Sequence, residues 1–164
     1  MTPAPETVHI GELLVRSADE APGGLLVPGL GSCVAVFLHD APRRLGGLAH
    51  ILLPEPMPHS PLLDPGRFAP TAVAALVDRL MQRGARRELL VAKVAGGATM
   101  FARVNGVRDS MGDRNVRAAM EALAREAIPV AAMDVGGSSG RTVRASLADG
   151  RVRINTLRGR PREI

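Results

Sequence analysis

The chain has 164 residues and a formal net charge of +5, and 46% of its residues are hydrophobic, enough for the core of one globular domain. Phe37, Phe68 and Phe101 are its only aromatic residues, so the stacking surfaces that bind single-stranded nucleic acid are nearly absent. Lys93 is the only lysine, and the positive charge therefore comes from scattered arginines. This pattern favours solvated faces or an acidic protein partner over nucleic acid.

The compartment is predicted from three features. Cys33 is the only cysteine, which excludes an intrachain disulfide and is typical of a reducing environment. The start of the chain lacks the basic and apolar segments of a signal peptide, and no apolar run has the length of a membrane span. We therefore expect a cytoplasmic protein without direct membrane insertion. Residues 1–7 and 158–164 are expected to be flexible.

The first half of the chain is predicted to be mostly β structure. Residues 8–15 alternate partly between apolar and polar and suggest a strand, and 25–27 form a short apolar run before a Pro-Gly segment. Residues 33–38 and 46–53 are almost continuously apolar and indicate two buried strands, which could form a hairpin. The proline-rich segment 54–65 is expected to be a loop.

Two helices and four strands are predicted after this loop. The first helix starts near Pro70 and ends at Gly84, because its apolar residues repeat with helical spacing. They are Val73, Leu76, Val77, Leu80 and Met81. The second helix runs from about residue 113 to 126, with Asp113 as its N-cap.

The predicted strands at 89–95 and 129–135 each lead into a double glycine, and 141–148 and 151–157 form a closing hairpin turned by Asp-Gly. The order of elements is several strands, helix, strand, helix, strands. This order indicates an α+β fold rather than a doubly wound sheet.

Cys33 is a candidate nucleophile because it follows a glycine-rich turn and begins a buried strand. Glycines allow a tight turn that brings amide N–H groups close to a ligand, and such amides could form an oxyanion hole beside the thiol. The alternative is that Cys33 is an ordinary small buried hydrophobic residue.

His50 is the candidate base. It is a polar ring inside an apolar strand, 17 residues after the cysteine, and hairpin pairing could bring the two side chains together. The alternative is a structural histidine bonded to a backbone carbonyl. The two unusual residues support each other, so a dyad is plausible.

Other polar residues are less informative. Gly96, Gly97 and Thr99 belong to a segment that could turn beside the site or simply leave the strand. Arg114 and Asn115 could have no role beyond starting a helix. The four histidines show no metal-ligand spacing, and no phosphate-binding glycine motif is present. No metal or cofactor is therefore expected.

Several segments together resemble the CheD family of chemoreceptor glutamine deamidases, in the order and at about the spacing found in that family. The resemblance covers residues 8 to 157. The segments are GLGSCVAVFLHD at 29–40, GGLAHILLPEP at 46–56, FAPTAVAALVDRL at 68–80, KVAGGATMF at 93–101, GDRNV at 112–116 and DVGGSSGRTV at 134–143.

The resemblance implies a β-sandwich flanked by helices, similar to the catalytic domain of cytotoxic necrotizing factor toxins. It also implies hydrolysis of specific glutamine side chains in methyl-accepting chemotaxis receptors to glutamate and ammonia, without a cofactor. Receptor cytoplasmic domains are the implied partners, and some family members also bind the phosphatase CheC. Because no long exposed apolar stripe is evident, we expect a monomer.

The resemblance also implies the site residues. It places the nucleophile at Cys33 and its histidine at His50, and it implies backbone or substrate contacts near the cysteine and the double glycine. The implied contact residues are Gly31, Ser32, Val34, Gly96, Gly97 and Thr99.

The sequence departs from the family at one position. The family usually has a threonine six residues before the cysteine, and here that residue is Val27. Either the Val27 main-chain carbonyl orients the histidine, or orientation is impaired and the protein is a weakly active or inactive adaptor that binds receptors or CheC.

Overall fold

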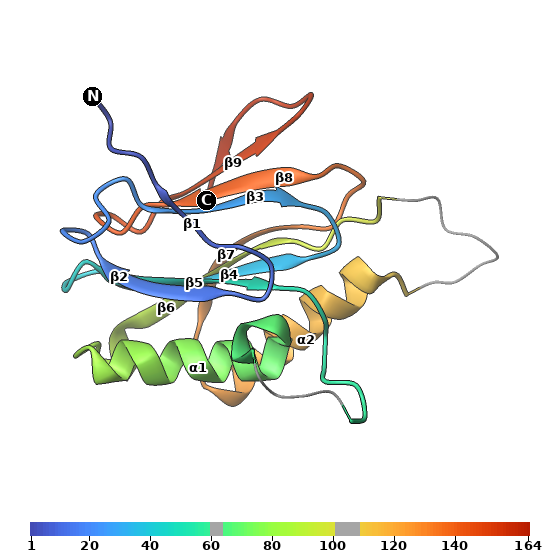
Figure 1. Ribbon diagram of the computed structural model, residues 1–164, viewed down its shortest axis with the longest axis horizontal. Helices are drawn as coiled ribbons and strands as arrows, with labels where there is room; N and C mark the ends of the chain where they lie inside the picture. Colours follow the sequence, from blue (N-terminus) through green and yellow to red (C-terminus); the bar gives the residue numbers. More distant parts are fainter. Residues whose placement is uncertain (60–63, 101–108) are drawn as a thin grey trace.

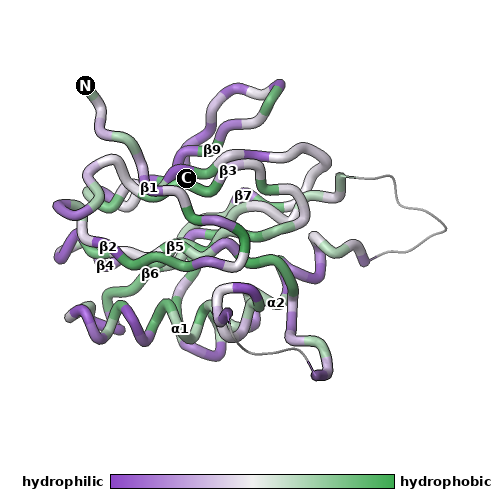
Figure 2. The backbone as a smooth tube through the Cα atoms, in the orientation of Figure 1, coloured by the Kyte–Doolittle hydropathy of each residue, from purple (hydrophilic) through white to green (hydrophobic). Residues whose placement is uncertain are grey.

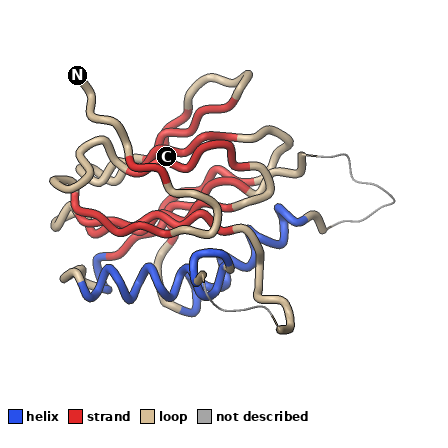
Figure 3. The backbone as a smooth tube through the Cα atoms, viewed as in Figure 1, coloured by secondary structure: helices blue, strands red, loops and turns tan. Residues whose placement is uncertain are grey.

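The computed structural model describes residues 1–59, 64–100 and 109–164. Two β-sheets lie face to face, and both long helices cover the outer face of one of them (Figure 1). The α+β prediction, with sandwiched sheets flanked by helices, is confirmed. Figure 3 shows the helices gathered on one side of the molecule and the strands stacked above them.

The sheet next to the helices has the strand order β2-β5-β4-β6-β7. Only the β6–β7 pair is parallel, and the other neighbours are antiparallel. All seven residues of the central strand β4 are buried, because elements pack on both faces of this sheet. The strands are β2 (Leu13–Ser17), β4 (Val34–Asp40), β5 (Leu45–Ile51), β6 (Leu90–Gly96) and β7 (Val130–Val135).

The second sheet has the order β1-β3-β8-β9-β10. A register shift interrupts the β3–β8 ladder between Val27 and Leu30, where the Pro-Gly pair lies. The strands are β1 (Glu6–Thr7), β3 (Leu25–Leu30), β8 (Arg141–Ala145), β9 (Val152–Thr156) and β10 (Arg162–Glu163).

Helices α1 (Ala69–Gln82) and α2 (Met111–Arg125) both pack on the first sheet. Pro70 lies in the first turn of α1, and Gly84 follows its end with φ +91°, as the sequence predicts. Short 3-10 turns at Pro65–Arg67 and Arg87–Leu89 precede α1 and β6. In Figure 2 the hydrophobic side of each helix faces the sheet and its polar side faces outward.

Two apolar cores follow from the alternation of side chains along β4. Val34, Val36 and Leu38 face the helices, whereas Ala35 and Phe37 face the second sheet. Residues of odd and even number on this strand therefore enter different cores. Cys33, which has the same parity as Ala35, belongs to the core between the two sheets.

The main differences from the predicted elements are at their boundaries. Residues 8–15 are not one strand, because the chain turns at Gly11, which has φ +81°. The N-cap of α2 is Ser110, not Asp113, and the Asp113 carboxylate accepts the Ser110 amide in a capping box. Met81, placed by its spacing on the apolar face of α1, is 40% exposed.

Part of each chain end pairs with a strand of the second sheet. Glu6 and Thr7 pair with β3, and the amide of Ile164 donates to the Val152 carbonyl at 2.9 Å. The sole lysine, Lys93, donates to the carbonyls of Gly150 and Ile164. In the described part of the chain, none of the helices is long and apolar enough to cross a membrane.

Candidate active site

Cys33 lies immediately before β4, after the bend at residues 31–32 that links the two sheets. Its side chain enters the core between the sheets and is 8% exposed. The predicted buried strand therefore begins one residue after the cysteine. This leaves the Cys33 backbone outside regular strand structure, while its side chain keeps the inward direction set by β4.

His50 lies opposite Ala35 in the β4–β5 ladder, so the predicted hairpin is confirmed and its register is known. Cys33 is two residues before Ala35 and points to the same face, which makes His50 its diagonal neighbour across the strands. Such neighbours typically have Cα atoms about 7–8 Å apart. In the described structure no hydrogen bond joins the two side chains, an arrangement that is common before substrate binds.

The His50 ring is oriented by a main-chain carbonyl. Its Nδ1 lies 3.2 Å from the Val8 oxygen, and since a carbonyl can only accept, Nδ1 carries the proton. The other nitrogen, Nε2, is then the basic one. The Val27 carbonyl was one of two alternatives offered by the sequence for orienting this ring, and the structure shows the Val8 carbonyl in that role instead. Val27 is fully buried on the neighbouring strand β3, whose Leu26 carbonyl accepts the Val8 amide at 2.7 Å.

Burial disfavours the charged forms of both candidate catalytic groups. Desolvation raises the pKa of the Cys33 thiol above its ordinary value, only partly opposed by a hydrogen bond from its own backbone amide. Desolvation lowers the pKa of His50, against the opposing effect of its bond to Val8. Each shift disfavours the charged form. Burial therefore favours a neutral thiol and a neutral imidazole in the resting site.

Three carbonyls around the cysteine are fixed by hydrogen bonds. The Gly31 carbonyl accepts from the Ala98 amide at 2.9 Å, and the Cys33 carbonyl accepts from the Gly97 amide at 2.8 Å. The Ser32 carbonyl accepts from a side chain of α2. In a trans peptide the carbonyl of one residue and the amide N–H of the next point in opposite directions. The Ser32 and Cys33 amides are thereby directed away from these partners.

These two amides are the best-placed oxyanion donors. Within residues 1–59, 64–100 and 109–164, neither the Ser32 nor the Cys33 amide donates a hydrogen bond to another residue, and the Cys33 amide contacts its own thiol. Val34, also expected to contribute, pairs with Ile51 on one side and Gly96 on the other, so its amide belongs to the sheet ladder. Gly31 supplies the bend, and a Cβ there would meet the Met100 side chain at 3.4 Å.

Gly96 and Gly97, at the end of β6, pack against the backbone of Cys33. Gly96 has φ +111°, and a Cβ on it would lie 2.4 Å from the Cys33 carbonyl oxygen. A Cβ on Gly97 would lie 2.9 Å from the carbonyl oxygen of Gly112 in the first turn of α2. Both positions thus require glycine because two backbones approach closely. The structure places them against the Cys33 backbone.

Thr99 is tied to the start of α2. Its hydroxyl donates to the Ser110 Oγ at 2.8 Å, and its amide donates to the Gly137 carbonyl at 2.9 Å. The structure places the side chain in contact with the α2 N-cap, although the resemblance implied a contact near the substrate.

Asn115, which the sequence assigned only to the start of a helix, contacts the cysteine segment. It is fully buried, and its Nδ2 donates both to the Ser32 carbonyl at 2.9 Å and to the Leu52 carbonyl at 3.0 Å. It therefore joins the segment before Cys33 to the segment after His50. The only available signal was an asparagine near a helix start, which usually indicates local capping.

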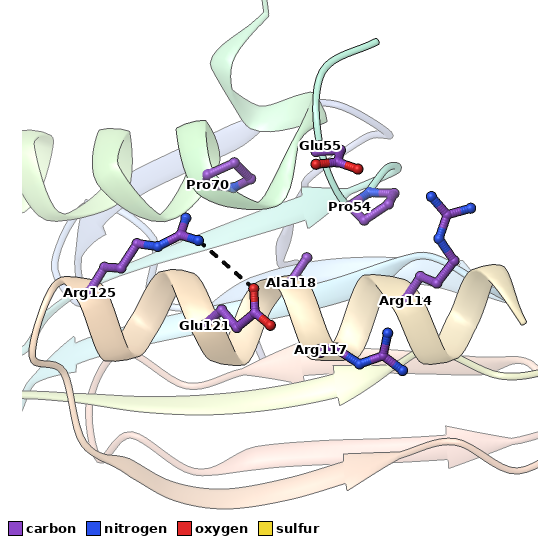
Figure 4. A pocket seen from close by; sticks show the side chains of 8 residues that line it. All are labelled: Pro54, Glu55, Pro70, Arg114, Arg117, Ala118, Glu121 and Arg125. Carbon is purple, nitrogen blue, oxygen red and sulfur yellow. Dashed lines mark ion pairs between the residues drawn. The ribbon is translucent and has the colours of Figure 1, made fainter. Parts of the chain in front are cut away.

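Arg114 points elsewhere. It lines a groove of about 260 Å³ between α2, the first turn of α1 and the loop at Pro54 and Glu55 (Figure 4). Arg125 in this groove pairs with Glu121 at 3.8 Å. The groove belongs to the helical layer, whereas Cys33 belongs to the core between the sheets.

Metal ligands do not gather near the cysteine. In the parts of the chain that the structure describes, no three His, Cys, Asp or Glu side chains lie close enough together to hold a metal ion. The described residues bring a thiol, an imidazole and backbone amides to this site.

A cysteine beside a carbonyl-oriented histidine, with two neighbouring amides that donate to no other described residue, defines a candidate cysteine-hydrolase site on an α+β sandwich. A family model described as CheD chemotactic sensory transduction matches residues 52–156, which begin just after His50. The relatives below match over most of this chain as well. The chain belongs to the CheD family.

Two relatives carry the name "Probable chemoreceptor glutamine deamidase CheD". The one from Moorella thermoacetica is 45% identical over 98% of this chain and 96% of its own length. The one from Methanococcus vannielii is 48% identical over 76% of this chain and 80% of its own length. Among solved structures, the Bacillus licheniformis hypothetical protein YfiH matches 82% of this chain and 60% of its own, at 13% identity and a TM-score of 0.49.

Proposed function

We propose that this protein hydrolyses glutamine side chains of chemoreceptors to glutamate and ammonia, with Cys33 as nucleophile and His50 as general base and acid. The observation that carries the proposal is the shared inward face of Cys33 and His50 on paired strands, with Nδ1 of His50 occupied by the Val8 carbonyl. The names of the relatives support the choice of substrate.

The first half of the reaction forms a thioester. Nε2 of His50 takes the Sγ proton as Cys33 attacks the side-chain carbonyl carbon of glutamine. The negative charge that develops on the carbonyl oxygen is stabilised by the amides of Ser32 and Cys33, which need no reorganisation. The C–N bond then breaks, and the proton held on Nε2 goes to the departing ammonia.

The second half restores the enzyme. Water enters in place of ammonia, His50 takes one of its protons, and the hydroxide adds to the thioester carbon. The C–S bond breaks, the proton returns to Sγ, and glutamate leaves. One water is consumed and one ammonia is released, so no metal, redox partner or organic cofactor enters the balance.

The setting we propose is the cytoplasmic part of the receptors, approached by a monomer that does not enter the bilayer. The net charge of +5 suits an acidic receptor segment. CheC is a second candidate partner on the strength of family membership. The adaptor alternative was based on Val27 in place of the family threonine. The Val8 carbonyl argues against this alternative, because it is an acceptor that orients His50 without a threonine.

The test incubates a purified receptor cytoplasmic domain with the wild type, Cys33→Ala and His50→Ala, and follows ammonia release and Gln-to-Glu conversion by mass spectrometry. His39→Ala is the matched control, because His39 is also a buried histidine, 7% exposed, bonded to a backbone carbonyl of Leu147. It lies six residues along β4 from Cys33, about 20 Å away at strand spacing.

We expect conversion by the wild type and His39→Ala, and a loss of at least about 100-fold in Cys33→Ala and His50→Ala. Receptor binding without conversion by the wild type would favour the adaptor. Equal losses in His39→Ala and His50→Ala would show that the histidine effect is one of stability.

A further inference from the structure

We infer that Asn115 is a positioning residue: its side-chain amide holds the Ser32–Cys33 peptide in place, so that the Cys33 amide stays aimed at the developing oxyanion. The catalytic part of this inference rests on the proposed function. Its structural part, the fixing of the segment before Cys33, does not.

The first argument is where the β4–β5 ladder ends. Its last pair is Val34 with Ile51, so no ladder bonds hold Cys33 or Leu52. The Leu52 amide turns away and donates to the Arg67 carbonyl at 3.0 Å. The ladder therefore pairs His50 with Ala35 but does not join the segment that carries Cys33 to the residue that follows Ile51.

The Asn115 side chain replaces the missing ladder bonds. The two N–H groups of its NH2 reach the Ser32 carbonyl at 2.9 Å and the Leu52 carbonyl at 3.0 Å. One planar amide therefore sets the separation between the segment that carries the nucleophile and the segment that follows His50. Because carbonyls only accept, the amide cannot be turned over without losing both bonds.

The second argument is the cost of this arrangement. The Asn115 side chain is fully buried, with 0% of its surface exposed. Its Oδ1 has no hydrogen-bond partner among the described residues. Burying an unpaired acceptor opposes folding, and such groups are uncommon in native proteins. Retaining one here is expected if the NH2 of the same side chain is needed at the site.

The third argument is the rigidity of the support. The capping box of Ser110 and Asp113 fixes the start of α2. A Cβ on Gly112 would lie 2.4 Å from the Gly97 carbonyl oxygen, so the first turn of α2 packs directly against the backbone of Gly97. Asn115 thus projects from a helix end that is itself fixed to the Cys33 segment.

The consequence concerns the transition state more than substrate binding. Holding the Ser32 carbonyl fixes the plane of the Ser32–Cys33 peptide, and with it the direction of the Cys33 N–H. A hydrogen-bond donor contributes most when it is already aimed at the oxyanion. Losing Asn115 should therefore lower kcat while KM changes little.

The variants are Asn115→Asp, which keeps the shape but presents a carboxylate to both carbonyls, and Asn115→Ser, which is smaller and keeps one donor. Asn155→Ala is the matched control, since Asn155 is an exposed asparagine on β9. We expect kcat for receptor glutamine to fall about 10-fold to 100-fold in Asn115→Asp and less in Asn115→Ser, with KM within about 3-fold. Asn155→Ala should match the wild type.

Two further measurements separate positioning from folding. Iodoacetamide alkylates a thiol without an oxyanion hole, so the alkylation rate of Cys33 should stay within about 3-fold in the variants. Amide hydrogen exchange of a peptide covering residues 31–36 should become at least about 10-fold faster in Asn115→Asp, because the bonds that restrain the Ser32–Cys33 segment are lost.

The inference is overturned if kcat stays within 2-fold of wild type with unchanged exchange. It is also overturned if alkylation speeds up together with global unfolding, or if neither Asn115 variant folds while Asn155→Ala does. If the wild type converts no receptor glutamine, the proposed function fails by itself. The exchange comparison then still decides whether Asn115 fixes the cysteine segment.

Discussion

Alanine substitutions at two glycines should have very different effects, although both residues follow or end a strand and both have positive φ. At Gly136, φ is +79° and a Cβ would meet nothing within 4 Å. At Gly96, φ is +111° and a Cβ would lie 2.4 Å from the Cys33 carbonyl oxygen. The pair separates the backbone cost of a side chain at positive φ from the steric cost of crowding the cysteine.

The expected magnitudes follow from these two terms. Left-handed backbone costs a non-glycine residue about 1–2 kcal/mol, so Gly136→Ala should destabilise by about that amount. Gly96→Ala adds a contact that the buried strands must relieve by moving, at about 1–3 kcal/mol more. For a chain of this size, each 1 kcal/mol lowers Tm by about 2–4 °C.

Urea denaturation at 25 °C and thermal melting of the two variants measure this difference. Gly96→Ala should be less stable than Gly136→Ala by at least about 1 kcal/mol. It should also lose activity in the receptor assay, because the Cys33 carbonyl is displaced. Equal destabilisation of the two variants within about 0.5 kcal/mol would refute the reasoning, since the close approach would then have no energetic consequence.

Four further outcomes are expected. The iodoacetamide rate of Cys33 should rise only at alkaline pH, with an apparent pKa above that of an ordinary thiol, because burial raises this pKa; a faster rate near neutrality would contradict it. Because burial lowers the pKa of His50, this residue binds a proton at higher pH in the unfolded chain than in the folded protein. The contribution of neutral His50 to stability is therefore complete above about pH 6.5 and is lost as the pH falls. Urea denaturation of His50→Gln should show a weaker dependence on acid pH than the wild type. Ser110→Ala, which removes the α2 cap, should cost about 1 kcal/mol in urea denaturation. Leu76→Ala, at a fully buried position of α1, should cost about 2–5 kcal/mol in the same assay.

Much of the fold could be predicted because it depends on local patterns. The continuous apolar runs around Cys33 and His50 indicate strands buried on both faces, and the helical spacing after Pro70 indicates α1. The boundaries were less accurate where one residue decides them. Ser110 was missed as the α2 cap because its partner in the capping box is aspartate, although the usual signal has glutamate or glutamine.

The supporting contacts of the site could not be predicted from the sequence. The acceptor for His50 is a main-chain oxygen 42 residues away, and any residue type at position 8 would supply it. The partners of Asn115 are also main-chain oxygens, 83 and 63 residues away. Side-chain patterns carry little information about backbone acceptors, so only the three-dimensional arrangement reveals them.

The burial of Cys33 and His50 has a consequence for selectivity in the proposed reaction. A thiolate–imidazolium pair would be reactive toward many electrophiles, but burial opposes both charges at Cys33 and His50. Proton transfer to Nε2 then becomes favourable mainly when the negative charge can pass on to an oxyanion held by backbone amides. A glutamine that places its carbonyl at the Ser32 and Cys33 amides satisfies this condition, whereas a small reagent that does not use the amides gains nothing from them. The same desolvation that weakens the nucleophile at rest would therefore make its reactivity depend on the correct placement of the substrate.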